Sequence, residues 1–266
     1  MLERSTRENG HEPAAGVRRS TVRVALVTGG TGGIGTEICK NLAELGNQVI
    51  ATYLGSEETQ ATDWQRARRS AGCDIHLVEC DVSNFDACAR MAETVESRYE
   101  SVDILINCAG ITRDKTLGKM QKDHWHAVLD TNLDSVFNVT RNVIDGMIRR
   151  GYGRIVNISS VNGQKGQFGQ TNYAAAKAGM HGFTKSLARE VASCGITVNT
   201  VSPGYVDTHL LKTIPDLIRQ DIVSKIPMGR LAKPEEIAWV VAFLASEEST
   251  YITGANIAVN GGLFMV

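Results

Sequence analysis

The stretch Thr28-Gly29-Gly30-Thr31-Gly32-Gly33-Ile34-Gly35 joins an apolar run over residues 22–27 to a helical pattern over residues 37–45. Strand, glycine turn and helix in this order are typical of a dinucleotide site. Glycines permit a tight turn and let backbone N–H groups approach a pyrophosphate, which then faces the helix N-terminus. A flexible loop is the alternative, but five glycines within residues 29–35 argue against it. We expect dinucleotide contacts from Gly29, Thr31, Gly33, Ile34 and Gly35.

Beyond this turn, strand-like and helical segments alternate along the chain. The later strand-like runs cover residues 48–53, 75–79, 102–107, 154–159, 197–201 and 256–259. The main helical stretches cover residues 86–99, 122–149, 173–192 and 235–245. Such alternation is typical of a parallel sheet with helices on both faces. We therefore predict an α/β, doubly wound Rossmann fold with a seven-stranded parallel sheet.

Length and composition agree with one compact domain. A chain of 266 residues can bury a large core, and no repeat or low-complexity linker divides it. We place this single domain at residues 21–266. Residues 1–20 are polar, aperiodic and rich in Arg and Glu, so we predict a disordered N-terminal extension. The glutamates argue against a transit peptide, and the segment lacks the apolar region of a secretion signal.

Charge and cysteine usage exclude several function classes. The formal net charge is −1, which provides no field for nucleic acid. The six cysteines show no Cys-x-x-Cys spacing, so we expect reduced thiols in a cytoplasmic protein. No apolar run reaches the length needed to span a membrane, and we expect no membrane partner.

Tyr173 and Lys177 stand four residues apart, thirteen residues after Ser160. Three alanines between them favour a helix, and the spacing places both side chains on one face. An ammonium group beside a phenol favours the phenolate, so the pKa of Tyr173 should fall. A surface tyrosine beside a lysine on an alanine-rich helix is the alternative. The glycine turn upstream favours an active site instead.

These motifs resemble those of the short-chain dehydrogenase/reductase family from about residue 22 onward. The family pattern Thr-Gly-x-x-x-Gly-x-Gly falls on residues 28–35. Its Asn-Asn-Ala-Gly element appears as Asn107-Cys108-Ala109-Gly110, with cysteine in place of the second asparagine. Its active-site asparagine matches Asn132, and its Pro-Gly turn matches Pro203-Gly204. By this resemblance, further coenzyme contacts come from Asn107, Ala109, Gly110, Tyr173, Lys177, Pro203, Gly204 and Val206.

The resemblance also implies the roles of four catalytic residues. Ser160 would hydrogen-bond the oxygen of a ketone, and Tyr173 would donate a proton to it while nicotinamide supplies hydride. Lys177 would lower the pKa of Tyr173 and hold the nicotinamide ribose. Asn132 would position a water that returns the proton through Lys177. No metal ion is expected.

The end of the second strand indicates which coenzyme is bound. An acidic residue there would accept hydrogen bonds from the adenosine ribose and select NAD. The strand instead ends at Tyr53, and the first acids follow at positions 57 and 58, so we expect NADPH, with Tyr53 among its contacts. Arg66 or Arg68 could assist with the 2′-phosphate. By resemblance, Asp81 and Val82 contact the adenine, although Asp81 also suits a helix-capping turn.

Substrate evidence lies around the catalytic residues. Residues 157–173 closely resemble the family's acetoacetyl-CoA reductases of polyhydroxybutyrate synthesis, which make the (R)-3-hydroxy product. By that resemblance, the acyl-CoA substrate would be contacted by Gln167, Phe168, Gln170 and Tyr205. An ordinary polar loop is the alternative for the two glutamines.

Two other functions stay open. A 3-oxoacyl-[acyl-carrier-protein] reductase of fatty-acid synthesis shares the whole catalytic set and would dock an acidic carrier. Basic residues that could serve this docking are Arg113, Lys115, Arg149 and Arg150. A non-catalytic nucleotide sensor would not need all four polar catalytic residues, which are present here.

The apolar surface of the helix over residues 235–245 is too broad for one sheet-facing stripe. The apolar C-terminal residues 263–266 follow the last strand nearby. A symmetric partner could bury such a surface, whereas a fully buried core helix is the alternative. Family resemblance points to a homotetramer that uses this helix in one interface and the helices over residues 122–149 and 173–192 in another.

Overall fold

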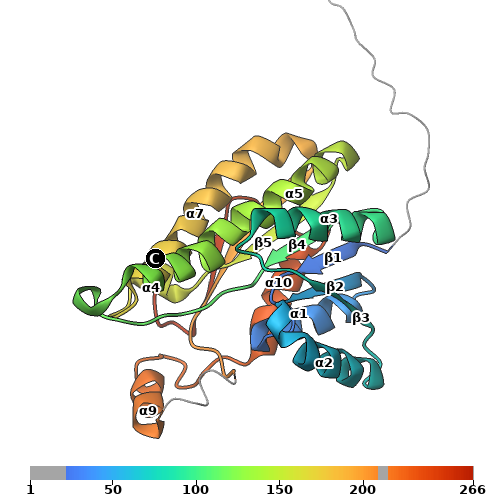
Figure 1. The fold of residues 1–266 in the computed structure, drawn as a ribbon. Coiled ribbons are helices and arrows are strands. Elements are labelled where there is room, and N and C mark those ends of the chain that lie inside the picture. The colour runs from blue at the N-terminus through green and yellow to red at the C-terminus, as the bar shows by residue number, and fades with distance from the viewer. Residues whose placement is uncertain (1–21, 209–214, 266) are drawn as a thin grey trace, which may run out of the picture.

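The computed structural model describes residues 22–208 and 215–265, and it shows one parallel sheet between two layers of helices (Figure 1). The predicted N-terminal extension and Val266 lie outside the described residues. The seven strands run in the order β3-β2-β1-β4-β5-β6-β7, and every pair of neighbours is parallel. This arrangement confirms the predicted doubly wound α/β fold with seven strands.

The strands match the predicted runs to within two residues at each end. They are β1 Val24–Val27, β2 Gln48–Tyr53, β3 Ile75–Glu79, β4 Ile104–Asn107, β5 Gly153–Ile158, β6 Ile196–Pro203 and β7 Asn256–Val259. The register pairs Val27 of β1 with Ala51 of β2 and with Ile106 of β4, so the carboxyl ends of the central strands lie level.

The α-helices lie between and after these strands. They are α1 Gly33–Glu44, α2 Glu58–Ser70, α3 Phe85–Tyr99, α4 Lys122–Leu129, α5 Ser135–Arg150, α6 Val161–Lys165, α7 Thr171–Val191, α9 Asp216–Ser224 and α10 Pro234–Ala245. Short 3₁₀ turns are η1 Gly55–Glu57, η2 Leu117–Lys119 and η4 Ala192–Cys194. None of the described helices is both long and apolar enough to span a lipid bilayer.

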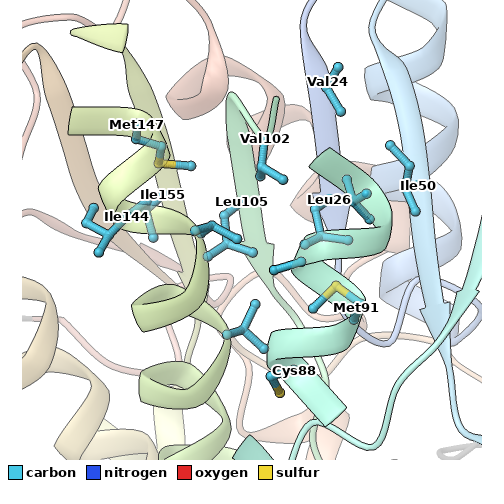
Figure 2. Packing of buried hydrophobic residues seen from close by; sticks show 14 of the residues in the cluster. Val24, Leu26, Ile50, Cys88, Met91, Val102, Leu105, Ile144, Met147 and Ile155 are labelled. Carbon is cyan, nitrogen blue, oxygen red and sulfur yellow. The ribbon is translucent and has the colours of Figure 1, made fainter. Parts of the chain in front are cut away.

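Both faces of the sheet are buried because successive strand residues point to opposite sides. Leu26 of β1 packs with Met91 of α3 and Met147 of α5 on one face (Figure 2). Ala25 and Val27 pack on the other face with α1 and α10. Each fully buried aliphatic side chain contributes about 1.5–3 kcal/mol relative to exposure. The strands therefore read as nearly continuous apolar runs in the sequence.

The stretch predicted to be helical over residues 122–149 is helical throughout, but it is not one regular α-helix. The structure divides this stretch into α4 and α5, and a π-helical turn, η3, joins them at Asp130–Asp134. Asn132 lies within the turn, and its side chain hydrogen-bonds the backbone of Ile111, which follows β4. Single π turns inside helices are often found at functional sites. The turn thus places a polar side chain beside the carboxyl end of the sheet.

Candidate active site

A cleft of about 1070 Å³ opens at the carboxyl ends of the strands. It lies where β1 neighbours β4, at the point where the strand order reverses. Ligands of open parallel sheets bind at this switch point. The lining comes from the glycine turn, from residues that follow β2 to β5, and from the first turns of α7. The fold therefore brings the two halves of the predicted site into one cavity.

The glycine turn fits closely against the rest of the sheet. Gly29 has φ +60°, and a Cβ added there would lie 2.9 Å from the Cα of Ala109. A Cβ on Gly35 would lie only 2.2 Å from the carbonyl oxygen of Gly29. The Oγ1 of Thr28 accepts hydrogen bonds from the backbone of Cys108 and Ala109, at 3.0 and 3.1 Å. These contacts leave the cleft side of the turn as bare backbone.

The N-terminus of α1 faces the same cleft. Gly32, Gly33 and Ile34 line the cleft at the start of this helix. Within the described residues, no side chain caps α1 at Gly32 and its first turn holds no acidic residue. The positive end of the helix dipole thus meets the cleft without a competing anion, which suits a pyrophosphate.

Most of the predicted coenzyme residues line this cleft. Those that do are Gly29, Thr31, Gly33, Ile34, Gly35, Tyr53, Asp81, Val82, Ala109, Gly110, Tyr173, Lys177, Pro203 and Gly204. Asn107 and Val206 do not line it. The Nδ2 of Asn107 donates to Asn157 Oδ1 at 2.8 Å in the interior, and Val206 is buried in a bridge to Ala232. Both support the walls of the site from behind.

Asp81 lines the cleft and forms a local turn, but it does not cap α3, whose N-cap is Asn84. The Oδ1 of Asp81 accepts hydrogen bonds from the backbone N–H and the hydroxyl of Ser83, at 3.0 and 2.7 Å, which forms a local turn. The same residue lines the cleft together with Val82 and Ser83. The segment after β3 is therefore a preformed wall at this end of the cleft.

We call the part of the cleft lined by Tyr53, Glu57, Trp64 and residues 80–83 its β2–β3 end. Sequence reasoning missed Glu57 there, although the short 3₁₀ turn after β2 brings its carboxylate to the cleft. Glu57 is exposed, so water screens its charge. Neither Arg66 nor Arg68 lines the cleft.

Ser160, Tyr173 and Lys177 line the opposite part of the cleft. Ser160 caps α6, and its Oγ accepts from the backbone N–H of Asn162 at 3.1 Å. Lys177 Nζ donates to the carbonyl oxygen of Ile158 at 2.7 Å and lies 5.7 Å from the centroid of the Tyr173 ring. The end of β5 and the face of α7 thus hold a hydroxyl, a phenol and an amine together.

Asn132 lies behind these groups and is fully buried. Its Oδ1 accepts from the N–H of Ile111 at 2.7 Å, and its Nδ2 donates to the carbonyl of Ile111 at 2.8 Å. A Cβ on Gly110 would lie 3.0 Å from this Oδ1 and 3.5 Å from Lys177 Nζ. A side chain at position 110 would therefore crowd both Asn132 and Lys177, and glycine leaves this space between them open.

Burial dominates the electrostatics of the pair on α7. It raises the pKa of Tyr173 to about 12, against a lowering by the hydrogen bond with Ser160. It also lowers the pKa of Lys177 to about 8. In the protein alone, burial thus outweighs any lowering of the Tyr173 pKa, and Lys177 donates instead to the carbonyl oxygen of Ile158. At neutral pH the phenol keeps its proton, and Lys177 loses its own as the pH rises through about 8.

The four residues predicted to contact an acyl group do not line the main cleft. Gln170 accepts from Asn162 Nδ2 at 3.0 Å and donates to Asp114 Oδ2 at 2.8 Å, which ties the loop before α7 to the loop after β4. Gln167 accepts from Lys165 Nζ at 2.9 Å, and Phe168 is 86% exposed. Tyr205 lines a separate cavity of about 70 Å³.

Sequence reasoning also missed other residues that line the cleft. Among them are Thr52, Trp64, Cys80, Ile111, Thr112, Ser159 and Thr208. Several follow a strand directly, so the rule that ligands bind beyond the carboxyl ends of strands would have found them. Trp64 lies on α2, whose approach to the cleft has no signal in the sequence. In residues 22–208 and 215–265, no three His, Cys, Asp or Glu side chains gather as a metal site requires.

Comparison with known proteins gives a consistent family assignment. A family model described as "Enoyl-(Acyl carrier protein) reductase" matches residues 29–264. An acetoacetyl-CoA reductase of Allochromatium vinosum is 60% identical over 243 residues, which cover 91% of this chain and 99% of the relative. An acetoacetyl-CoA reductase of Cupriavidus necator is 54% identical over 245 residues, covering 92% and 99%.

Reductases of the second substrate class are also similar. A 3-oxoacyl-[acyl-carrier-protein] reductase of Vibrio cholerae is 45% identical over 244 residues, which cover 92% of this chain and 98% of the relative. The acetoacetyl-CoA reductases and the carrier-protein reductases both align with nearly the whole chain. The two groups therefore differ in their sequence identity to this chain and not in how much of it they cover.

Proposed function

The chain belongs to the short-chain dehydrogenase/reductase family, and on that basis we propose that it reduces acetoacetyl-CoA to (R)-3-hydroxybutanoyl-CoA with NADPH, supplying polyhydroxybutyrate synthesis. One observation carries the chemical part: Ser160, Tyr173 and Lys177 line the same cleft as the glycine turn. Several acetoacetyl-CoA reductases at 46–60% identity support the substrate.

The bound nicotinamide coenzyme supplies the hydride. The hydroxyl of Ser160 donates a hydrogen bond to the ketone oxygen, where negative charge grows. Tyr173 transfers its proton to that oxygen, and its raised pKa ensures that the phenol is protonated beforehand at neutral pH. Lys177 would hold the nicotinamide ribose and pass a proton back to the phenolate left behind. Asn132 holds the Ile111 backbone beside Lys177 and would position the water that restores the proton.

The described residues fit the coenzyme along the length of the cleft. Gly29, Gly33 and Gly35 would hold the pyrophosphate against the α1 N-terminus, where added side chains would meet neighbouring atoms at 2.2–2.9 Å. Asp81 and Val82 would flank the adenine. Gly110 and Lys177 would contact the nicotinamide ribose beside Asn132.

Kinetics with two acyl donors test the substrate. We expect kcat/KM for acetoacetyl-CoA to exceed that for an acetoacetyl-carrier protein by at least about tenfold. Gln170→Ala should raise KM for acetoacetyl-CoA, because Gln170 joins the two loops at the mouth through Asn162 and Asp114, while the dissociation constant of NADPH stays unchanged. A preference for the carrier protein would instead identify a 3-oxoacyl-[acyl-carrier-protein] reductase. Absence of turnover with either donor would favour a nucleotide sensor.

Coenzyme preference provides a second prediction. Because β2 ends at Tyr53 and the Glu57 charge is screened by water, we expect kcat/KM with NADPH to exceed that with NADH. Tyr53→Asp should shift the preference towards NADH, since a carboxylate at the strand end repels a 2′-phosphate. Glu57→Gln should shift it further towards NADPH. Steady-state kinetics with both coenzymes measure this, and a strong NADH preference in the unchanged protein would contradict the proposal.

We also propose a homotetramer. On α10, Ile237 and Val241 are buried, but Trp239 is 62% exposed and Phe243 is 49% exposed, so the helix has a second apolar side. On α5, Phe137 is half-exposed and stacks on Phe85, with ring centroids 6.0 Å apart. Two separate apolar surfaces suit an assembly with more than one two-fold axis.

Light scattering at micromolar concentration should report a mass near four chains. Trp239→Glu should reduce this mass, because burying a charge in an apolar interface is unfavourable. Leu45→Glu is the matched control, since Leu45 is an exposed apolar residue outside both surfaces. An active monomer, or equal effects of the two variants, would contradict this assembly.

We propose a cytoplasmic location without nucleic-acid or membrane partners. The nearly balanced charge supports the absence of nucleic acid. The six cysteines are free thiols in the structure, in agreement with a reducing compartment.

A further inference from the structure

Two cysteines that the proposed mechanism does not use meet beside the cleft. Cys80 directly follows β3, and Cys88 lies in the first turn of α3. Their Sγ atoms are 3.8 Å apart, and both side chains are buried. Cys80 nevertheless lines the cleft, so it borders the space that a small reagent can enter.

The segment between these cysteines forms a wall of the β2–β3 end. Residues 81–83 all line the cleft. The carbonyl oxygen of Val82 accepts from Cys88 Sγ at 3.5 Å and from Asn138 Nδ2 at 3.1 Å. The thiol of Cys88 is therefore one of two side chains that hold the wall in place.

We propose that Cys80 and Cys88 form a reversible disulfide under oxidising conditions and that this bond weakens coenzyme binding. The second part rests on the proposed function, because it assumes that residues 81–83 contact the adenosine part of the coenzyme. The first part depends only on the two thiols and their separation.

Hydrogen peroxide is a sufficient oxidant. The Cys80 thiolate attacks one peroxide oxygen, the O–O bond breaks, and a sulfenic acid and one water result. Cys88 then attacks the Cys80 sulfur, the S–O bond breaks, the S–S bond forms and a second water leaves. Two electrons pass from the two sulfurs to the peroxide, and a dithiol reductant reverses the change. Cys80 lines the cleft and Cys88 does not, which favours Cys80 as the attacking thiol.

Closing the bond changes the contacts of the wall. A disulfide holds its sulfurs about 2 Å apart, whereas these thiols are separated by 3.8 Å. Oxidation also removes the thiol hydrogen through which Cys88 donates to Val82. Because displacements of about 1 Å in a binding site have large effects, we expect the dissociation constant of NADPH to rise about tenfold.

Peptide mapping identifies the bond. The purified enzyme is treated with hydrogen peroxide, alkylated without reduction and cleaved before aspartate. Asp74, Asp81 and Asp86 separate the nearby cysteines, so peptides 74–80 and 86–102 carry Cys80 and Cys88 alone. A linked pair of these peptides, lighter by two hydrogens than their sum and split by dithiothreitol, is the expected result. Their absence at peroxide doses that oxidise Cys73 would overturn the proposal.

Binding measurements test the consequence. The dissociation constant of NADPH should rise in the oxidised protein, return after dithiothreitol, and stay insensitive to peroxide in Cys88→Ala. Cys73→Ser is the matched control, since it removes a neighbouring thiol but leaves the pair, and it should respond like the unchanged protein. If the linked peptides form and NADPH affinity stays constant, the regulatory part is wrong. If NADPH binds neither form, the proposed coenzyme site is wrong, while the peptides still decide whether the bond forms.

Discussion

Replacing Tyr173 with phenylalanine lowers kcat by about 10²- to 10⁴-fold, because it removes the proton that the ketone oxygen receives. The ring and its packing on α7 stay, so the fold and the NADPH dissociation constant should remain close to those of the unchanged enzyme. Burial keeps the pKa of this phenol at about 12, so nearly every molecule carries the proton at neutral pH. Steady-state kinetics at saturating NADPH measure the loss.

Thr171→Ser provides a control in the same helical turn, since Thr171 is exposed and does not line the cleft. It should retain kcat within a factor of about two, as surface substitutions usually have small effects. Turnover of the Tyr173→Phe variant at a similar level would show that another group donates the proton.

Replacing Gly35 with alanine should abolish tight coenzyme binding. The added Cβ would lie 2.2 Å from the carbonyl oxygen of Gly29, and both atoms belong to backbone segments that cannot rotate away. The whole glycine turn must therefore shift to accommodate the added methyl group. Overpacking of this kind costs about 3 kcal/mol, which corresponds to roughly 100-fold weaker coenzyme binding. Titration of NADPH by fluorescence measures the dissociation constant.

Gly118→Ala is the matched control because an added Cβ there meets nothing within 4 Å. Circular dichroism before titration separates loss of binding from loss of fold. Wild-type affinity in a folded Gly35→Ala variant would place the pyrophosphate elsewhere.

The strands were predictable because burial on both faces leaves a continuous apolar run for each of them. The runs for β2, β3 and β7 coincide with the observed bounds. The helix α2 was not among the predicted stretches because it is largely exposed, and Ala61 is its one buried residue. The pattern of apolar residues in the sequence therefore reveals a helix or strand more readily when that element buries more apolar surface.

Interactions between distant segments account for what the sequence could not predict. At the π turn between α4 and α5, Asn132 hydrogen-bonds the backbone of Ile111, which lies twenty-one positions away in the sequence. These hydrogen bonds do not alter the helical spacing of the apolar residues, so the sequence pattern does not reveal the turn. The pKa of Tyr173 depends mainly on its burial in the folded protein. Motifs could therefore name the candidate catalytic residues, but their electrostatic state required the three-dimensional arrangement.

The π turn at Asp130–Asp134 also restricts how this part of the chain can change in length. A π turn holds one residue more than an α-helical path, and each residue rotates a helix by about 100°. Deleting one residue of the π turn would restore regular geometry and keep α5 in its orientation relative to α4, whereas deleting a residue at the start of α5 would rotate the rest of that helix by about 100°. Val139, Val143 and Met147 would then leave the core that they share with α3. The gene region encoding η3 should therefore tolerate the loss of one codon far better than the region encoding the start of α5.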